Sequence, residues 1–353
     1  MSQATFSLSQ LGWRAFYSQQ LSLEDFEHST PARIASVHRG RLLALTDQGE
    51  MELVPPSFDA SITVGASVTV GDWVLVQSDT TRMTRVLERR SFLSRLAAGS
   101  QQRQQSIAAN VDTLFVVTSC NDDFNVSRLE RYLALAHQAG VDPAIVLTKR
   151  DLCDDPSSFV KAIGTSAARV PVFAVDATRH DDAGALLELM PCGATVAFVG
   201  SSGVGKSTLI NTLTGAAQTT GAIREDDSKG RHTTTHREMI ALPGGAWLID
   251  TPGMRELKVG DVEQGLRMTF DDIEALAQHC RFRDCKHGGD RGCAVGAAIE
   301  AGTLDRRRFD NYLKLQREAR HARQTEHERR ERERRFGRQL KVMLEQQRKE
   351  RGR

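Results

Sequence analysis

The chain has 353 residues, of which 40% are hydrophobic and 26% are charged, and its formal net charge is +2. No stretch approaches about 18 consecutive apolar residues, which excludes a membrane-spanning helix, and we expect no membrane partner. The length accommodates one α/β domain of about 160 residues flanked by two smaller modules.

The first hundred residues predict a short extension followed by a β-barrel. Residues 1–35 mix aromatic with polar residues, and they either pack on the next domain or stay mobile. Residues 36–97 contain short alternating segments separated by turn residues, which favours a small closed barrel. The segments are Gly40 to Ala44, Gly49 to Val54, Val68 to Val76 and Met83 to Leu87. An OB barrel would bind RNA, whereas an SH3-like barrel with a purely structural role is the alternative.

A candidate base-reading element follows the strand-like run Ala144 to Leu147. Its residues are Thr148, Lys149, Arg150 and Asp151. The Asp151 carboxylate can accept two hydrogen bonds from the ring N–H and the exocyclic amine of guanine. Adenine offers no such pair of donors, so a site built on these bonds should reject ATP. The alternative is a surface turn in which Asp151 caps a helix.

A complete phosphate-binding loop follows the short apolar run Ala194 to Val199. Glycines allow backbone N–H groups to close around phosphate oxygens, and the helix that starts after the loop favours an anion at its N-terminus. Lys206 neutralises the β- and γ-phosphates, and the Ser207 hydroxyl is predicted to bind Mg²⁺. The predicted nucleotide contacts are Gly200, Ser201, Ser202, Gly203, Val204, Gly205, Lys206, Ser207 and Thr208.

A third element, Asp250 to Gly253, ends the apolar run Ala246 to Ile249. Asp250 then lies at a strand tip, where it can hold Mg²⁺ through water, while the Gly253 N–H faces the γ-phosphate. The base-reading element precedes the phosphate loop, although it follows that loop in ordinary GTPases. The three elements therefore predict a circularly permuted GTPase domain, which is tolerated because domain termini usually lie close together.

The Thr-rich stretch 230–235 supplies the remaining candidates for GTP chemistry. Either Thr234 or Thr235 should reach Mg²⁺ when GTP closes this loop. Small GTPases orient the attacking water with a Gln just after Asp-x-x-Gly, and Met254 stands there in this chain. Intrinsic hydrolysis should therefore be slow. The candidate catalytic residues are Lys206 and His232. The alternative for His232 is a solvent-exposed loop histidine with no catalytic role.

A zinc site is predicted from the spacing Cys280-x4-Cys285-x-His287-x5-Cys293. Three thiolates and one imidazole suit tetrahedral Zn²⁺ in a closed structural site. A disulfide framework is disfavoured, because no secretory segment is visible and a phosphate-loop protein belongs in the reducing cytosol. We therefore expect a cytoplasmic protein.

The last segment, residues 317–353, has 14 Lys and Arg against 7 Asp and Glu, so the tail is +7 and the rest of the chain −5. This composition predicts a solvated helix with near-neighbour ion pairs, or a disordered end. A salt-sensitive contact with RNA phosphates is compatible with either.

With these motifs, the chain resembles the bacterial ribosome-small-subunit-dependent GTPase A family, RsgA or YjeQ. The resemblance covers about residues 36–316 and ends before the charged tail, which indicates a paralogue or a lineage-specific addition. Asp176 departs from the family pattern, in which Ser usually stands. The resemblance rests on the motifs above and on Val70 to Val74, Arg89 to Ser91, Ala109 to Asp112 and Gly230 to Thr235.

The resemblance implies a multidomain fold and a role in late maturation of the 30S subunit. Its domains are an OB-fold barrel at 36–97, a circularly permuted GTPase domain at 98–262 and a mostly helical zinc domain at 263–316. The implied ligands are GTP or GDP, Mg²⁺ and one structural Zn²⁺. The implied partners are the 30S subunit, which stimulates hydrolysis, and its 16S rRNA, with the protein itself a monomer.

Two alternatives of other classes remain open from the sequence. One is a P-loop ATPase that acts on nucleic acid, which would leave Asp151 without a role. The other is a non-catalytic RNA-binding chaperone that uses GTP only as a folding ligand.

Overall fold

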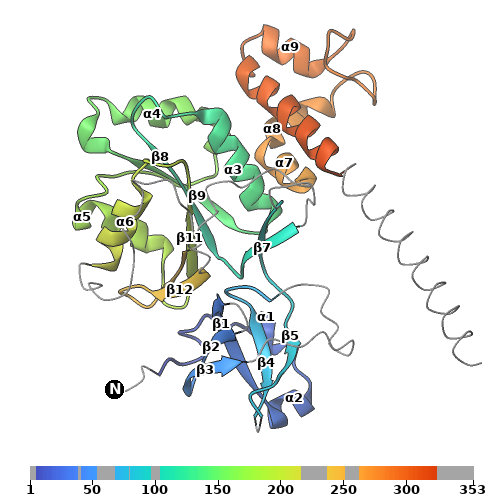
Figure 1. Ribbon diagram of the computed structural model, residues 1–353. Helices are drawn as coiled ribbons and strands as arrows, with labels where there is room; N and C mark the ends of the chain where they lie inside the picture. Colours follow the sequence, from blue (N-terminus) through green and yellow to red (C-terminus); the bar gives the residue numbers. More distant parts are fainter. Residues whose placement is uncertain are drawn as a thin grey trace, which may run out of the picture. The chain divides into compact units, whose positions relative to one another are not determined.

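The computed structural model in Figure 1 divides into two compact units, one of residues 1–95 and 104–257 and one of residues 96–103 and 258–353. No described helix is both long enough and apolar enough to cross a membrane. The structure describes residues 5–38, 41–53, 68–78, 80–96, 104–215, 237–250 and 262–323.

The larger part of the first unit is an α/β domain with the strand order β10-β9-β8-β11-β13-β12. The first five strands of this order run parallel, and β12 is antiparallel to β13. The strands are β8 (Thr113–Ser119), β9 (Asp142–Thr148), β10 (Val172–Ala174), β11 (Thr195–Val199), β12 (Arg237–Ala241) and β13 (Trp247–Asp250). Because the strand that carries Thr148 precedes β11 in the chain, the fold has the predicted circular permutation.

Helices cover this sheet because its central strands are hydrophobic throughout. The buried side chains of β8, β9 and β11 alternate between two layers, as in other parallel sheets. One layer forms a single core cluster with α5 and α6, and α3 contacts β8 and β9. The helices of this domain are α3 (Val126–Gln138), α4 (Pro156–Ile163), α5 (His180–Ala183) and α6 (Lys206–Thr214), with 3-10 turns at Arg150–Leu152, Gly164–Ala167 and Gly184–Leu189.

The N-terminal domain is a five-stranded antiparallel sheet in the order β3-β2-β1-β4-β5. Its inward-facing residues form a separate core that includes Ile34, Val74 and Met83. The strands are β1 (Ser29–His38), β2 (Arg41–Thr46), β3 (Gly49–Leu53), β4 (Trp73–Gln77) and β5 (Met83–Val86).

Two boundaries of this domain differ from those predicted. Strand β1 begins at Ser29, although the sequence places the start of the barrel at residue 36, because Pro31 and Arg33 interrupt the alternation. Pro31 is tolerated since β1 pairs there with β4 alone, while its pairing with β2 begins at Arg33. The predicted strand Val68 to Val76 begins only at Trp73, because Gly71 has a φ of 86° and residues 69–72 form a turn.

The residues before β1 pack on both parts of the first unit, which decides between the two alternatives for residues 5–35. They include α1 (Ala15–Ser18) and α2 (Leu23–His28). The ring of Trp13 meets that of Trp73 edge-on at 4.8 Å, and Trp247 Nε1 donates to the Gln10 carbonyl at 2.7 Å. Leu11 is completely buried. The extension therefore joins the N-terminal sheet to the α/β domain.

Strand β1 also pairs with β12, so one path of hydrogen-bonded strands runs from the N-terminal sheet into the α/β sheet. Ser36 is opposite Glu238, and Val37 is opposite Arg237. The sequence indicates separate domains at 36–97 and 98–262, and it holds no signal for this pairing. The ribbon β6 (Phe92–Leu96) and β7 (Gln104–Ala109) follows the barrel.

The second unit is mostly helical, as predicted. Its core surrounds Phe270, and the buried Arg308 lies 4.6 Å over that ring. Arg308 donates to both Asp272 oxygens, at 2.8 and 2.9 Å, so its charge is neutralised. The helices are α7 (Glu263–Thr269), α8 (Asp271–Ala277), α9 (Ala294–Glu300) and a helix over 306–323. That last helix crosses residue 316, where the sequence ends the zinc domain, and residues 324–353 of the tail lie outside the described residues.

The N-terminal domain contains an ion pair whose removal should lower the free energy of unfolding considerably. Asp72 is fully buried and accepts two hydrogen bonds from Arg89, at 2.7 and 2.8 Å, and one from the Thr69 N–H at 2.8 Å. Asp72→Ala would leave the largely buried Arg89 without this carboxylate. We expect the free energy of unfolding to fall by about 3–5 kcal/mol, measured by urea denaturation with tryptophan fluorescence.

The matched control is Glu52→Ala in the same domain. Glu52 pairs with Arg41, but both side chains are exposed. This substitution should change the free energy of unfolding by less than about 1 kcal/mol. Equal losses in the two variants would show that burial of the Asp72 pair does not stabilise the N-terminal domain.

Candidate nucleotide site and candidate metal centre

The phosphate loop connects the end of β11 to the start of α6. Gly200, Gly203 and Gly205 have φ values of 150°, 77° and 91°. A Cβ atom on Gly200 would lie 2.1 Å from the Val117 carbonyl oxygen, so only glycine fits there. The loop thus delivers the chain to the N-terminus of a nine-residue helix, where free N–H groups favour an anion.

Several side chains of the loop are accessible to a ligand. Lys206 Nζ folds back over the loop and donates to the Gly200 carbonyl at 2.9 Å and to the Ser201 carbonyl. Ser202, Ser207 and Thr208 are exposed to solvent. The Ser207 hydroxyl is therefore accessible to a metal ion, and Lys206 can exchange neutral carbonyl partners for phosphate oxygens.

The base-reading element touches the phosphate loop directly. Thr148 ends β9, is fully buried, and its Oγ1 lies 2.5 Å from the Val204 carbonyl oxygen and 3.1 Å from that of Thr118. Lys149 follows with a φ of 58°, and this left-handed turn starts the 3-10 helix. Asp151 lies on that turn with an exposed side chain, so its carboxylate is open to a ligand.

A network that the sequence did not reveal joins this element to the next loop. Arg150 pairs with Asp182 at 2.8 Å and donates to the Ala174 carbonyl at 3.3 Å. Asp182 also accepts the Asp176 N–H at 2.6 Å. Because Asp182 lies 31 residues beyond Asp151, no local pattern could connect them.

Asp176, which departs from the family pattern, keeps its carboxylate engaged. Its Oδ1 accepts the Thr178 hydroxyl at 2.6 Å and the Thr178 N–H at 2.9 Å. These hydrogen bonds lower the pKa of Asp176, and the one from the Thr178 hydroxyl has the largest effect. The carboxylate therefore supports the loop as a serine hydroxyl could. The next residue is also held, because the Thr212 hydroxyl donates to the Ala177 carbonyl at 2.7 Å.

The remaining predicted residues belong to the third element and to the Thr-rich stretch. Asp250 ends β13, which runs parallel to β11 with Ile249 opposite Ala197. Its backbone therefore reaches the same sheet edge as the phosphate loop and Thr148. His232, Thr234, Thr235 and Gly253 lie outside the described residues.

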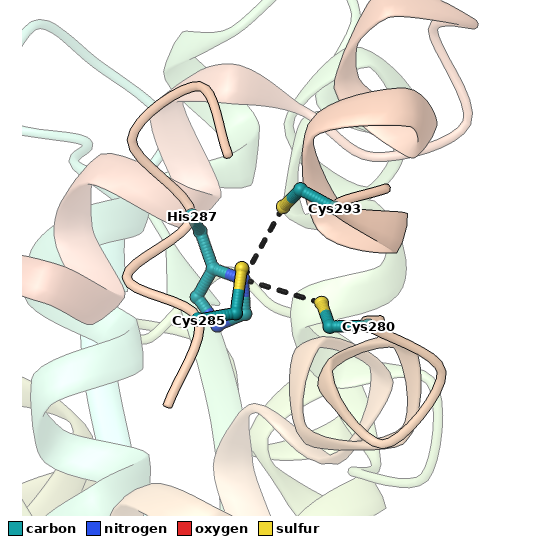
Figure 2. A group of neighbouring side chains, drawn as sticks. All are labelled: Cys280, Cys285, His287 and Cys293. Atoms are coloured by element: carbon teal, nitrogen blue, oxygen red, sulfur yellow. Dashed lines mark hydrogen bonds between the residues drawn. The ribbon is translucent and has the colours of Figure 1, made fainter. Parts of the chain in front are cut away.

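The predicted zinc ligands gather in the second unit (Figure 2). Cys280, Cys285, His287 and Cys293 place their donor atoms within 4.8 Å of one another. His287 Nδ1 lies 3.5 Å from Cys280 Sγ and 3.4 Å from Cys293 Sγ. A tetrahedral ion with Zn–S of about 2.3 Å and Zn–N of about 2.0–2.1 Å requires about 3.5 Å between sulfur and nitrogen. The spacing of these atoms therefore fits zinc.

Local structure prepares this cluster for a metal. Cys293 caps α9 and accepts the Gly296 N–H at 3.1 Å. Burial raises the pKa of Cys280, but N–H groups of Val295 and Ala294 outweigh it and leave the pKa below its usual value. All six cysteines of the chain are free thiols, so the cluster has no competing disulfide.

Comparison with known proteins gives a consistent result. Residues 86–260 match the family described as RsgA GTPase. A "Small ribosomal subunit biogenesis GTPase RsgA 2" from Vibrio parahaemolyticus is 48% identical over 343 residues, which are 97% of this chain and 94% of that protein. A "Small ribosomal subunit biogenesis GTPase RsgA" from Mesorhizobium japonicum is 48% identical over 319 residues, or 89% of this chain and 90% of that protein.

Two solved structures share the fold. YjeQ from Thermotoga maritima superposes with a TM-score of 0.61 at 22% identity, covering 81% of this chain and 97% of that one. YloQ, described as a circularly permuted GTPase, gives 0.59 at 23% identity, with 83% and 96% covered. These likenesses show the fold, including the permutation.

The extent of the sequence similarity corrects one expectation. The motifs predict a resemblance over about residues 36–316 that ends before the tail. The match to the Vibrio protein covers 97% of the chain, so it extends into both terminal segments. The motifs do not indicate this, because a charged segment without a short motif offers no pattern by which a relationship can be recognised.

The metal centre can be tested by removing one ligand. Cys285→Ser should lose bound zinc and increase hydrogen exchange across residues 262–323, because structural zinc supplies much of the folding free energy of a small module. Nucleotide binding should persist. Cys192→Ser, which removes an exposed thiol outside the cluster, should retain zinc. Metal analysis that finds no stoichiometric zinc in the unaltered protein would contradict the assignment.

The Arg150–Asp182 pair should position the base-reading element. We expect Arg150→Ala and Asp182→Ala each to raise the Kd for GDP by about 3- to 10-fold, with the double variant little worse than Asp182→Ala, since the pair couples by about 0.5–3 kcal/mol. Calorimetry measures each Kd. Asp181→Ala, at the exposed neighbouring carboxylate, is the control and should bind normally. Additive losses would show that the two side chains act separately.

Proposed function

The chain belongs to the RsgA GTPase family, and we propose that it hydrolyses GTP at the edge formed by β9, β11 and β13 when it is bound to the 30S subunit. It is a GTP hydrolase of small ribosomal subunit biogenesis, like the relatives that match nearly its whole length. The proposal adds which residues act and what controls them.

The contact between Thr148 and the Val204 carbonyl supports the site most directly. It joins the element that would read the base to the loop that would hold the phosphates. We propose that Asp151 accepts the guanine N–H groups and that the phosphate loop, with Lys206, binds the β- and γ-phosphates. A P-loop ATPase would have no use for this arrangement.

The metal and the attacking water require residues of the other elements. We propose that Ser207 binds Mg²⁺, that Asp250 holds it through water, and that Thr234 or Thr235 joins them when GTP is bound. The Gly253 N–H would face the γ-phosphate. Met254 cannot orient water, so His232 is proposed for that role, and slow turnover without the ribosome follows.

The flanking domains would recognise the ribosomal subunit. The strand order β3-β2-β1-β4-β5 supports an OB barrel, and we propose that it binds 16S rRNA. The Cys280, Cys285, His287 and Cys293 cluster would hold one structural zinc, which stiffens the second unit. We propose a monomer that works in the cytoplasm, with residues 317–353 contributing positive charge toward RNA phosphates.

The test measures GTP turnover with and without 30S subunits. A change of base specificity then shows whether the turnover belongs to this site. The protein should hydrolyse GTP slowly alone and at least about tenfold faster with 30S subunits. Asp151→Asn should lose this activity with GTP but regain it with xanthosine triphosphate, because the amide donates where xanthine presents a carbonyl. Phosphate release measures each rate.

Each outcome has a distinct meaning. If 30S subunits stimulate hydrolysis of xanthosine triphosphate, and not of GTP, by Asp151→Asn, the turnover belongs to this site and not to a contaminating enzyme. GTP binding without turnover, even with 30S subunits, would favour the RNA-binding chaperone. Normal GTP hydrolysis by Asp151→Asn would refute the base-reading role of residues 148–151.

A further inference from the structure

An arginine outside the predicted motifs lies against the phosphate loop. Arg128, near the start of α3, directs its guanidinium to the Ser201 hydroxyl, with which it is in hydrogen-bond contact. The same NH1 atom lies 3.1 Å from each oxygen of Asp123. Arg128 and Asp123 are both partly exposed, with side-chain accessibilities of 37% and 39%, so a ligand in the loop could reach the guanidinium.

The chain holds Arg128 in place by several independent contacts. Asn125 caps α3, and its side chain accepts the Arg128 N–H at 2.9 Å. Leu129 and Leu133 are buried under the helix, which anchors it to the sheet. In the preceding loop, Asn121 accepts the Ser119 hydroxyl at 2.7 Å and the Asp123 N–H at 3.1 Å. The arginine is therefore presented by a well-ordered corner between β8 and α3.

The position of this contact along the loop indicates which part of a nucleotide it faces. Thr148 of the base-reading element touches Val204. Arg128 touches Ser201, three residues away toward β11, where the carbonyl also accepts Lys206 Nζ. The lysine of such a loop serves the β- and γ-phosphates. Arg128 therefore lies at the terminal-phosphate side of the loop, away from the base.

Two cationic side chains converge on Ser201, since Lys206 donates to its carbonyl and Arg128 to its hydroxyl. Among the contacts of Arg128 that the structure describes, the acidic partner is the partly exposed Asp123. A polyphosphate bound in the loop would present negative charge to both cations, and Arg binds phosphate through two parallel donors.

We propose that Arg128 is a catalytic residue of this GTPase, contributed in cis, which contacts the γ-phosphoryl group during hydrolysis. In that step the water oxygen forms a bond to the γ-phosphorus as the bond to the β–γ bridging oxygen breaks. That electron pair stays on GDP, and the proton that the water loses passes to an oxygen of the phosphate that is released. Arg128 remains protonated and donates hydrogen bonds to the oxygens on which charge develops. The inference rests on the proposed GTP hydrolysis at this loop.

The experiment uses the full-length protein and compares turnover with nucleotide binding. Arg128→Gln should lower kcat for GTP by about 10³-fold, the lower end of what an arginine contributes to phosphoryl transfer, with and without 30S subunits. The Kd for GDP should change by less than about twofold. Binding of GDP with aluminium fluoride, which mimics the transferred group, should be lost.

Two matched variants distinguish catalysis from a structural role. Arg131→Gln makes the same change one turn along α3 and should retain turnover and analogue binding. Asp123→Asn removes the ion pair but keeps the arginine, so it should retain both as well. Equal loss in Asp123→Asn and Arg128→Gln would show that the pair only supports the loop and would overturn the proposal.

The two proposals fail in different ways. If the unaltered protein does not hydrolyse GTP, the proposed function is wrong. If it does, and Arg128→Gln hydrolyses GTP equally fast and binds the aluminium fluoride complex normally, only the role of Arg128 is refuted.

Discussion

The pairing of β1 with β12 is the constraint on which the arrangement of the first unit depends. Without it, β12 would be the open edge of the α/β sheet, and an unpaired edge invites wrong association. The barrel closes that edge with its own strand. Arg33 of β1 then reaches the start of β11, where it donates to Thr195 Oγ1 at 2.6 Å, and burial lowers its pKa to about 10. Barrel and nucleotide domain therefore share one set of buried contacts.

This connection has a functional consequence. Val37 of the barrel is opposite Arg237, the first residue of β12, and β12 in turn pairs with β13, which ends at Asp250. A ligand that shifts β1 must therefore shift the strands that flank two of the predicted nucleotide elements. Coupling through packed strands needs no separate hinge, and it would give the proposed RNA contact of the N-terminal domain a physical route to the site.

The parts that sequence reasoning could predict share one property, which is that their residues are close together in the chain. The phosphate loop spans 200–208 and the metal cluster 280–293, so spacing alone predicts the chemistry. The Arg150–Asp182 pair, the Arg128–Ser201 contact and the β1–β12 pairing join residues that are 32, 73 and about 200 positions apart, respectively. No periodicity reports such contacts, and only the fold brings them together. The early start of β1 could not be predicted because Pro31 lies in it, and proline usually interrupts a strand.

The geometry of the phosphate loop suggests how recognition and chemistry are kept apart. Its Val204 end is held by the buried hydroxyl of Thr148, which belongs to β9 and cannot move without the sheet. Its Ser201 end is contacted by the partly exposed side chains of Lys206 and Arg128, which donate to neutral oxygens of Gly200 and Ser201 there. Replacing neutral partners by phosphate strengthens each hydrogen bond, because charge-assisted bonds are about twice as strong. The rigid end is thus suited to selecting the base, and the adjustable end to following the charge that moves during hydrolysis.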